Sequence, residues 1–67
     1  MTQVPDISVV IPTWNTRDLL ERCLDSLYAS EGPSFEVIVV DNASSDGSVA
    51  LIEERYPAVQ LIENDRN

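Results

Sequence analysis

Residues 35–48, with the sequence FEVIVVDNASSDGS, decide the fold predicted for this chain of 67 residues. The run over residues 35–40 is short, largely apolar and rich in β-branched side chains, which is typical of a strand buried on both faces. Asp41 ends that run, and the small and polar residues after it are typical of a tight loop and a helix N-cap. In an open α/β sheet, ligands bind beyond the carboxyl ends of parallel strands. A carboxylate at this position is therefore placed for recognition or chemistry.

A first strand and a first helix precede this stretch. Residues 7–11 (ISVVI) are predicted to form a strand that Pro12 ends, because proline has no N–H to donate to a neighbouring strand. Asn15 or Thr16 can cap the helix that follows. Cys23 is expected to be a core residue of this helix. Its buried side is predicted from apolar residues at helical spacing: Leu19, Leu20, Cys23, Leu24, Leu27 and Tyr28.

A second helix over about residues 45–55 and a third strand over residues 59–62 complete the unit. Strands that alternate with helices predict an α/β fold with a parallel sheet. Strand order 3-2-1 with right-handed crossovers places both helices on one face. The first two strands are nevertheless apolar on both faces, so a covering layer is missing from the second face. We expect either the front part of a larger domain, which we favour, or a homodimer formed through the bare face.

The composition argues against several classes of function. The formal net charge is −8, from 12 acidic and 4 basic residues, whereas nucleic acid or an anionic membrane surface would require a basic patch. The chain has no histidine, the commonest general base and metal ligand. Its single cysteine excludes an internal disulfide and is compatible with a reducing compartment. Because no apolar run approaches the roughly 20 residues of a membrane span, we expect a cytoplasmic location.

Asp41 and Trp14 are the candidates for ligand binding. In the predicted strand order, the loop that carries Trp14 lies beside the strand that Asp41 ends. An aromatic ring beside a carboxylate can hold a planar base by stacking and an edge hydrogen bond. Two alternatives stay open: Asp41 can simply cap its loop, and Trp14 can cover the top of the core. Asp46 is interpreted as a helix cap, since no phosphate-loop spacing surrounds it and a cation shared with Asp41 would have few ligands.

Three motifs in order also resemble a known family. The segments ISVVIPTWN (7–15), LxxCLxSL (20–27) and EVIVVDNASSDGS (36–48) are similar to the N-terminal part of family 2 glycosyltransferases, which have the GT-A fold. The tail LIENDRN (61–67) resembles the branch that includes rhamnosyltransferase-like proteins. This resemblance implies that residues 1–67 form a single partial domain, the Rossmann-like half of a GT-A nucleotide-sugar-binding domain.

The resemblance implies a site for a nucleotide-sugar donor. Thr13, Trp14 and Asn15 would surround the nucleobase, and Asp41 would accept a hydrogen bond from it, usually from the uracil or thymine of a UDP- or dTDP-sugar. Asn42 stands where many members have a second aspartate, which leaves the donor open. The family's Asp-x-Asp segment, which binds Mg²⁺ or Mn²⁺ and the diphosphate, and its acidic general base lie downstream of residue 67.

We therefore expect the donor-binding portion of an inverting glycosyltransferase of cell-wall or polysaccharide biosynthesis. No catalytic or metal-binding residue is assigned in the chain, which is expected to be inactive by itself. The full-length enzyme could work at the inner face of the membrane. Two alternatives are a non-catalytic α/β protein that binds a nucleotide or a partner through its bare face, and a fragment without ligand affinity. The sequence that follows Asn67 in the gene would discriminate between them.

Overall fold

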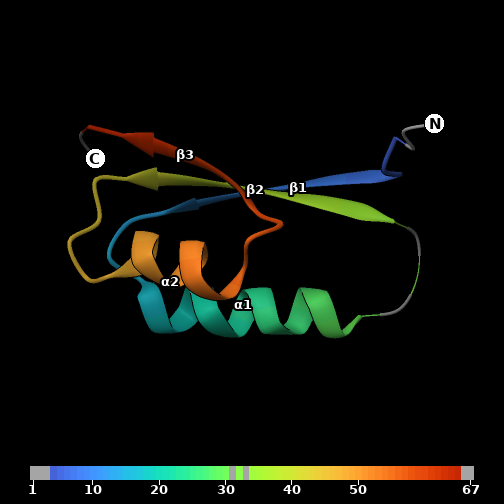
Figure 1. Cartoon of the computed structure of the whole chain (residues 1–67), viewed down its shortest axis with the longest axis horizontal. Helices are drawn as coiled ribbons and strands as arrows, with labels where there is room; N and C mark the ends of the chain where they lie inside the picture. Colours follow the sequence, from blue (N-terminus) through green and yellow to red (C-terminus); the bar gives the residue numbers. More distant parts are fainter. Residues whose placement is uncertain (1–3, 31, 33, 66–67) are drawn as a thin grey trace.

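The computed structural model describes residues 4–30, 32 and 34–65. Strands and helices alternate along the chain (Figure 1): β1 (Ile7–Thr13), α1 (Arg17–Ala29), β2 (Phe35–Asn42), α2 (Ser48–Arg55) and β3 (Gln60–Asn64). β2 is the central strand and pairs in parallel with β1 on one side and with β3 on the other. The predicted α/β class and the strand order 3-2-1 are both confirmed.

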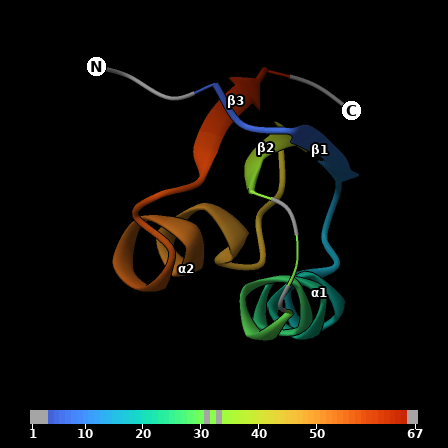
Figure 2. The ribbon, with the colours of Figure 1, turned by 90° about the vertical axis from the view of Figure 1, so that its right-hand side faces the viewer.

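Both helices cover the same face of the sheet, as right-handed crossovers require for this strand order (Figure 2). The hydrophobic core lies between that face and the helices, with Leu24 and Val39 completely buried. Alternate residues of β2 are buried, because successive side chains of a strand point to opposite faces. The remaining core residues come from both helices, β2 and the segment before β3: Leu20, Val37, Leu51, Ile52, Tyr56 and Val59.

β1 continues beyond its predicted end, through Pro12 to Thr13. The N–H of Ile7 donates to the carbonyl of Ser34, beside the start of β2. Successive amides of a strand point to opposite sides, so the nitrogen of Pro12 faces the open edge of the sheet. An edge strand loses no inter-strand hydrogen bond when proline occupies such a position. The prediction that Pro12 ends the strand was wrong for this reason.

α1 buries a narrower side than its apolar spacing predicts. Leu20 and Leu24 are buried, whereas Leu19 is 66% exposed and Tyr28 is also exposed. Cys23 is an exposed free cysteine, so the prediction that it belongs to the core was wrong. Leu19 and Cys23 are four residues apart and form one flank of the helix. β1 is the edge of the sheet, and no further element in the described part of the chain covers that flank.

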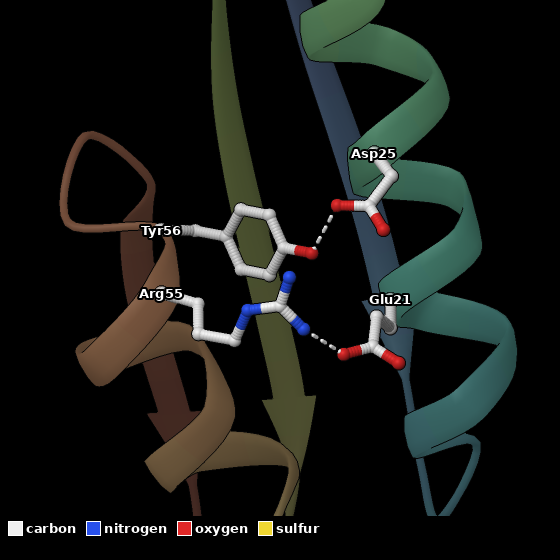
Figure 3. Close-up of polar contacts among 4 residues, drawn as sticks. All are labelled: Glu21, Asp25, Arg55 and Tyr56. Atoms are coloured by element: carbon white, nitrogen blue, oxygen red, sulfur yellow. Dashed lines mark hydrogen bonds and ion pairs between the residues drawn. The ribbon is translucent and has the colours of Figure 1, made fainter.

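Polar contacts join the two helices (Figure 3). Arg55 Nη1 donates to Glu21 Oε2 in an ion pair, and the hydroxyl of Tyr56 donates to Asp25 Oδ1. The guanidinium of Arg55 lies 5.6 Å from the ring centroid of Tyr56, which stacks on Tyr28 with centroids 6.2 Å apart. The hydrogen bond to Asp25 raises the pKa of the Tyr56 hydroxyl, and burial and the Asp25 charge raise it further. The ion pair between Arg55 and Glu21 is largely exposed, so it contributes only about 0–1 kcal/mol to the stability of the fold.

The other element boundaries differ from the predicted ones by one to three residues. α2 begins at Ser48 because Gly47 has φ +89°, a left-handed conformation that suits glycine and lies outside the helix. β2 includes Asp41 and Asn42, and β3 runs to Asn64, whose side-chain amide donates to Asn42 Oδ1 at 2.8 Å. No helix in residues 4–30, 32 and 34–65 is long and apolar enough to cross a membrane.

The sheet face opposite the helices is uncovered within the part of the chain that the structure describes. Val10 on β1 is 58% exposed and Ile62 on β3 is 50% exposed. Glu36 spans the sheet near one end, where Oε1 accepts from the Ser8 hydroxyl at 2.6 Å and Oε2 accepts from Gln60 Nε2 at 2.9 Å. The bare apolar face that the strand pattern predicted is therefore present.

Candidate functional site

Two loops lie side by side at the carboxyl end of the sheet (Figure 1). Residues 14–16 follow β1, and residues 43–47 follow β2. The register of the parallel pair places Thr13, the last residue of β1, opposite Asp41, the last residue but one of β2. The structure therefore brings the sequence-predicted site residues together at the carboxyl end of the sheet: Thr13, Trp14, Asn15 and Asp41.

Asp41 is 2% exposed, and its two carboxylate oxygens have different surroundings. Oδ2 accepts a hydrogen bond from the Ser44 N–H at 3.0 Å, so Asp41 caps the loop that follows it. Oδ1 is buried and has no hydrogen-bond partner among the described residues. A buried polar atom without a partner is costly, and folded proteins contain few of them. A ligand N–H could supply the missing hydrogen bond to Oδ1 after a rearrangement that exposes this atom.

Trp14 is 49% exposed and lies between two anchored neighbours. Part of its ring surface is therefore available for stacking. Thr13 is buried, and its Oγ1 lies 2.8 Å from Thr16 Oγ1, so one of the two hydroxyls donates to the other. The hydroxyl of Thr13 is thus engaged within its own loop.

Asn15 connects the two loops. Its backbone N–H donates to Ser44 Oγ at 2.9 Å, and its Oδ1 accepts from the Ser45 N–H at 2.7 Å. Asn15 has φ +49°, a left-handed conformation that asparagine tolerates better than most residues. These contacts show a structural function for Asn15 that the sequence analysis missed, because its partners lie about 30 residues further along the chain.

Asp46 connects the N-termini of both helices. Its Oδ2 accepts from the N–H of Arg17, the first residue of α1, at 2.9 Å. Its Oδ1 accepts from the N–H of Ser48, the first residue of α2, at 3.1 Å and from the Ser48 hydroxyl. The hydrogen bond from the Ser48 hydroxyl holds the pKa of the Asp46 carboxyl below its ordinary value, and the two backbone amides lower it further against the opposing effect of burial. The capping function predicted for Asp46 is thus confirmed and extends to two helices.

These carboxylates do not fit a divalent cation. Within the described residues, no group of three histidine, cysteine, aspartate or glutamate side chains is close enough together to hold a metal ion. Both oxygens of Asp46 and one of Asp41 accept hydrogen bonds from the protein itself. In the described part of the chain, the two aspartates hold the loops and the helix ends.

Comparison with known proteins reveals relatives of this chain. The profile described as Glycosyl transferase family 2 matches residues 8–67. The succinoglycan biosynthesis protein ExoO of Rhizobium meliloti is 41% identical over 66 residues, which cover 97% of this chain and 19% of that protein. The poly(ribitol-phosphate) beta-glucosyltransferase of Bacillus spizizenii is 39% identical over 66 residues, covering 91% of this chain and 10% of the relative.

A solved structure has the same architecture. The mannosyltransferase PcManGT from Pyrobaculum calidifontis, in complex with GDP-Man and Mn²⁺, superposes with a TM-score of 0.81 at 36% sequence identity. The match covers 98% of this chain and 21% of the mannosyltransferase. This chain therefore spans about a tenth to a fifth of the length of these three proteins. The profile match over residues 8–67 shows that the chain belongs to glycosyl transferase family 2, and its three parallel strands and two helices have the Rossmann-like arrangement of the GT-A fold.

Proposed function

We propose that this chain is the nucleobase-binding part of a glycosyltransferase that uses a nucleotide-sugar donor. The observation that carries the proposal is the buried Oδ1 of Asp41, which lacks a partner among the described residues. Asp41 lies near the end of β2, opposite Thr13 and therefore beside the loop of the half-exposed Trp14. Family membership supports it, as does the similarity to a mannosyltransferase solved with GDP-Man. Asp41 would accept a hydrogen bond from the base while Trp14 stacks on the ring.

The surroundings of Asp41 favour uracil or thymine as the base. Guanine presents a ring N–H and a neighbouring amino group, which together pair best with both oxygens of a carboxylate. Uracil and thymine present a single ring N–H, which needs one acceptor. Because the Ser44 N–H already takes one lone pair of Oδ2 and Oδ1 has no partner among the described residues, Oδ1 is the more open acceptor and suits a single donor. We therefore propose a UDP- or dTDP-sugar donor, consistent with the resemblance of residues 61–67 to the rhamnosyltransferase-like branch.

An NMR titration of UDP, dTDP and GDP tests both parts of the proposal. UDP and dTDP should shift the Trp14 indole and Asp41 amide signals before others, and GDP should shift them less. Asp41→Asn replaces the charged acceptor by an amide and should weaken binding by roughly 10–100-fold, the equivalent of one hydrogen bond to a charged group. Glu53 is exposed on α2 and is not part of the two loops. Glu53→Gln also removes one negative charge and should bind the nucleotides like the wild type. Equal affinities of the wild type and Asp41→Asn would refute the assignment.

Sugar transfer itself would require more than these residues supply. We propose that residues 1–67 form only part of one GT-A domain, and that Mg²⁺ or Mn²⁺ acts with the diphosphate elsewhere in a full-length cytoplasmic enzyme. The similarity of this chain to only 21% of a mannosyltransferase solved with GDP-Man and Mn²⁺ supports this division. The chain given a nucleotide sugar, Mn²⁺ and a saccharide acceptor should release no more nucleoside diphosphate than a mock preparation. Release well above that background would contradict the proposal.

Self-association is a second property favoured by a specific observation. Val10 and Ile62 expose about half of their surface on the uncovered face of the sheet, and burying such side chains is favourable by about 25 cal/mol per Å². We propose that the isolated chain self-associates through this face, as a homodimer. Sedimentation should show a concentration-dependent mass that Ile62→Lys lowers and Glu54→Lys, on the exposed side of α2, does not. A compact monomer at high concentration would contradict this proposal.

A further inference from the structure

We propose that Asn15 is a positioning residue, which holds the loop of Trp14 against the loop that follows Asp41 instead of contacting the nucleotide. This inference rests on the proposed function for the identity of the ligand, whereas the contacts behind it lie within the chain. The resemblance to the family places Asn15 among the residues around the nucleobase. In the structure, its backbone N–H and its Oδ1 both bind the opposite loop, through Ser44 and Ser45.

The contacts of Asn15 fix the chain immediately after Trp14. The Asn15 backbone is held at φ +49°, and the hydrogen bonds to Ser44 and Ser45 measure 2.9 and 2.7 Å. Two residues later, the Arg17 N–H donates to Asp46 at 2.9 Å. Residues 15–17 thus make three hydrogen bonds to the loop of residues 43–47, two from Asn15 and one from Arg17 at the start of α1. We define the Asn15–Ser44–Ser45 contacts as the loop clasp.

The loop clasp gives Trp14 a defined position before any ligand arrives. On the other side of Trp14, Thr13 is buried, paired in register with Asp41 and in hydroxyl contact with Thr16. The backbone of Trp14 is therefore held at both ends while its side chain stays half-exposed. Because the backbone on both sides of Trp14 is already ordered, less entropy is lost when its ring binds a base. Asn15 therefore affects the binding of the ligand indirectly, by ordering the chain next to Trp14.

The variants that test the loop clasp separate the side chain of Asn15 from its backbone conformation. Asn15→Gly permits the positive φ but removes the Oδ1 acceptor, whereas Asn15→Asp retains an acceptor at the same position. Ser44→Ala breaks the clasp from the other loop. Ala43→Gly is the matched control, because Ala43 is exposed, has φ +63° and has no polar side-chain atom to lose.

Trp14 is the only tryptophan of the chain, so its fluorescence reports on the clasp without a ligand. Asn15→Gly and Ser44→Ala should increase the quenching of Trp14 by acrylamide and lower its anisotropy, whereas Asn15→Asp and Ala43→Gly should match the wild type. In the UDP titration, Asn15→Gly should weaken binding about fivefold, the equivalent of one neutral hydrogen bond of about 1 kcal/mol. Thermal unfolding of each variant confirms that the fold is retained.

The outcomes separate this inference from the proposed function. Wild-type fluorescence in both Asn15→Gly and Ser44→Ala would overturn the inference, whether or not the nucleotide binds. Altered fluorescence with wild-type affinity for UDP would also overturn it, since Asn15 would then order the loop without affecting recognition. If the wild type binds none of the three nucleotides, the proposed function fails, and the ligand-free fluorescence still decides whether Asn15 positions Trp14.

Discussion

Replacing Asp46 with alanine should destabilise both helices at once. The carboxylate accepts hydrogen bonds from the first backbone N–H of α1, at Arg17, and from the first of α2, at Ser48. Loss of one such cap costs about 0.5–2 kcal/mol. With two helix ends affected, Asp46→Ala should lower the free energy of unfolding by about 2 kcal/mol. A core of this size supplies only roughly 3–5 kcal/mol, so the variant should keep about 1–3 kcal/mol and unfold at a clearly lower urea concentration.

Urea unfolding followed by circular dichroism measures this difference. Asp18→Ala is the control, because Asp18 also lies in the first turn of α1 but has no hydrogen bond to another described residue. Its loss removes only a favourable interaction with the helix dipole, worth about 0.3–1 kcal/mol. The reasoning is refuted if Asp46→Ala is no less stable than Asp18→Ala at neutral pH.

The same experiment has a defined pH dependence. Because the hydrogen bond from Ser48 holds the pKa of Asp46 below its ordinary value, the folded state favours the carboxylate form. The stabilisation is therefore complete above the ordinary pKa of about 4 and disappears as the pH falls through the lower pKa of the folded state. The stability difference between the wild type and Asp46→Ala should shrink in that acidic range. A difference that stays constant there would contradict the assignment of Asp46 as a charged cap.

Two further predictions concern the helices. Tyr56→Phe removes the hydrogen bond to Asp25 and should cost about 0.5–1.5 kcal/mol in urea unfolding at neutral pH. Because that bond raises the pKa of Tyr56, its stabilising contribution should be complete below about pH 10 and be lost as the pH rises through the folded-state pKa; an ordinary pKa in ultraviolet titration would contradict this. Cys23 is exposed on α1, so a thiol reagent should modify it in the native chain about as fast as in denaturant; strong protection in the native state would restore its core assignment.

Much of the fold could be predicted because the β-branched runs and the helical spacing act over short distances in the sequence. The continuous apolar run before Asp41 correctly indicated a central strand, and the β-α-β-α-β order correctly gave the parallel sheet. Helical spacing showed which residues of α1 share a side but not how wide the covered side is. Leu19 and Cys23 were misplaced for this reason, since their exposure depends on where the sheet ends.

The candidate site was predictable only in outline. Because parallel strands share their carboxyl edge, Asp41 and Trp14 could be placed together from the sequence. The connections made by Asn15 and Asp46 depend on residues about 30 positions away, which no local pattern reveals. The different surroundings of the two Asp41 oxygens likewise depend on how the following loop folds back.

Pro12 limits how folded copies of this chain can polymerise. An exposed edge strand invites another strand to join it, which is the first step toward amyloid-like ribbons. On β1, the amides of Ser8 and Val10 alternate with those that pair with β2, and Pro12 interrupts the outward series where the next donor would stand. An incoming strand could align along the first half of β1 and would have to diverge near the loops. Among the described residues, the proline thus leaves the loop end of this edge without an outward donor, which disfavours ribbon growth there.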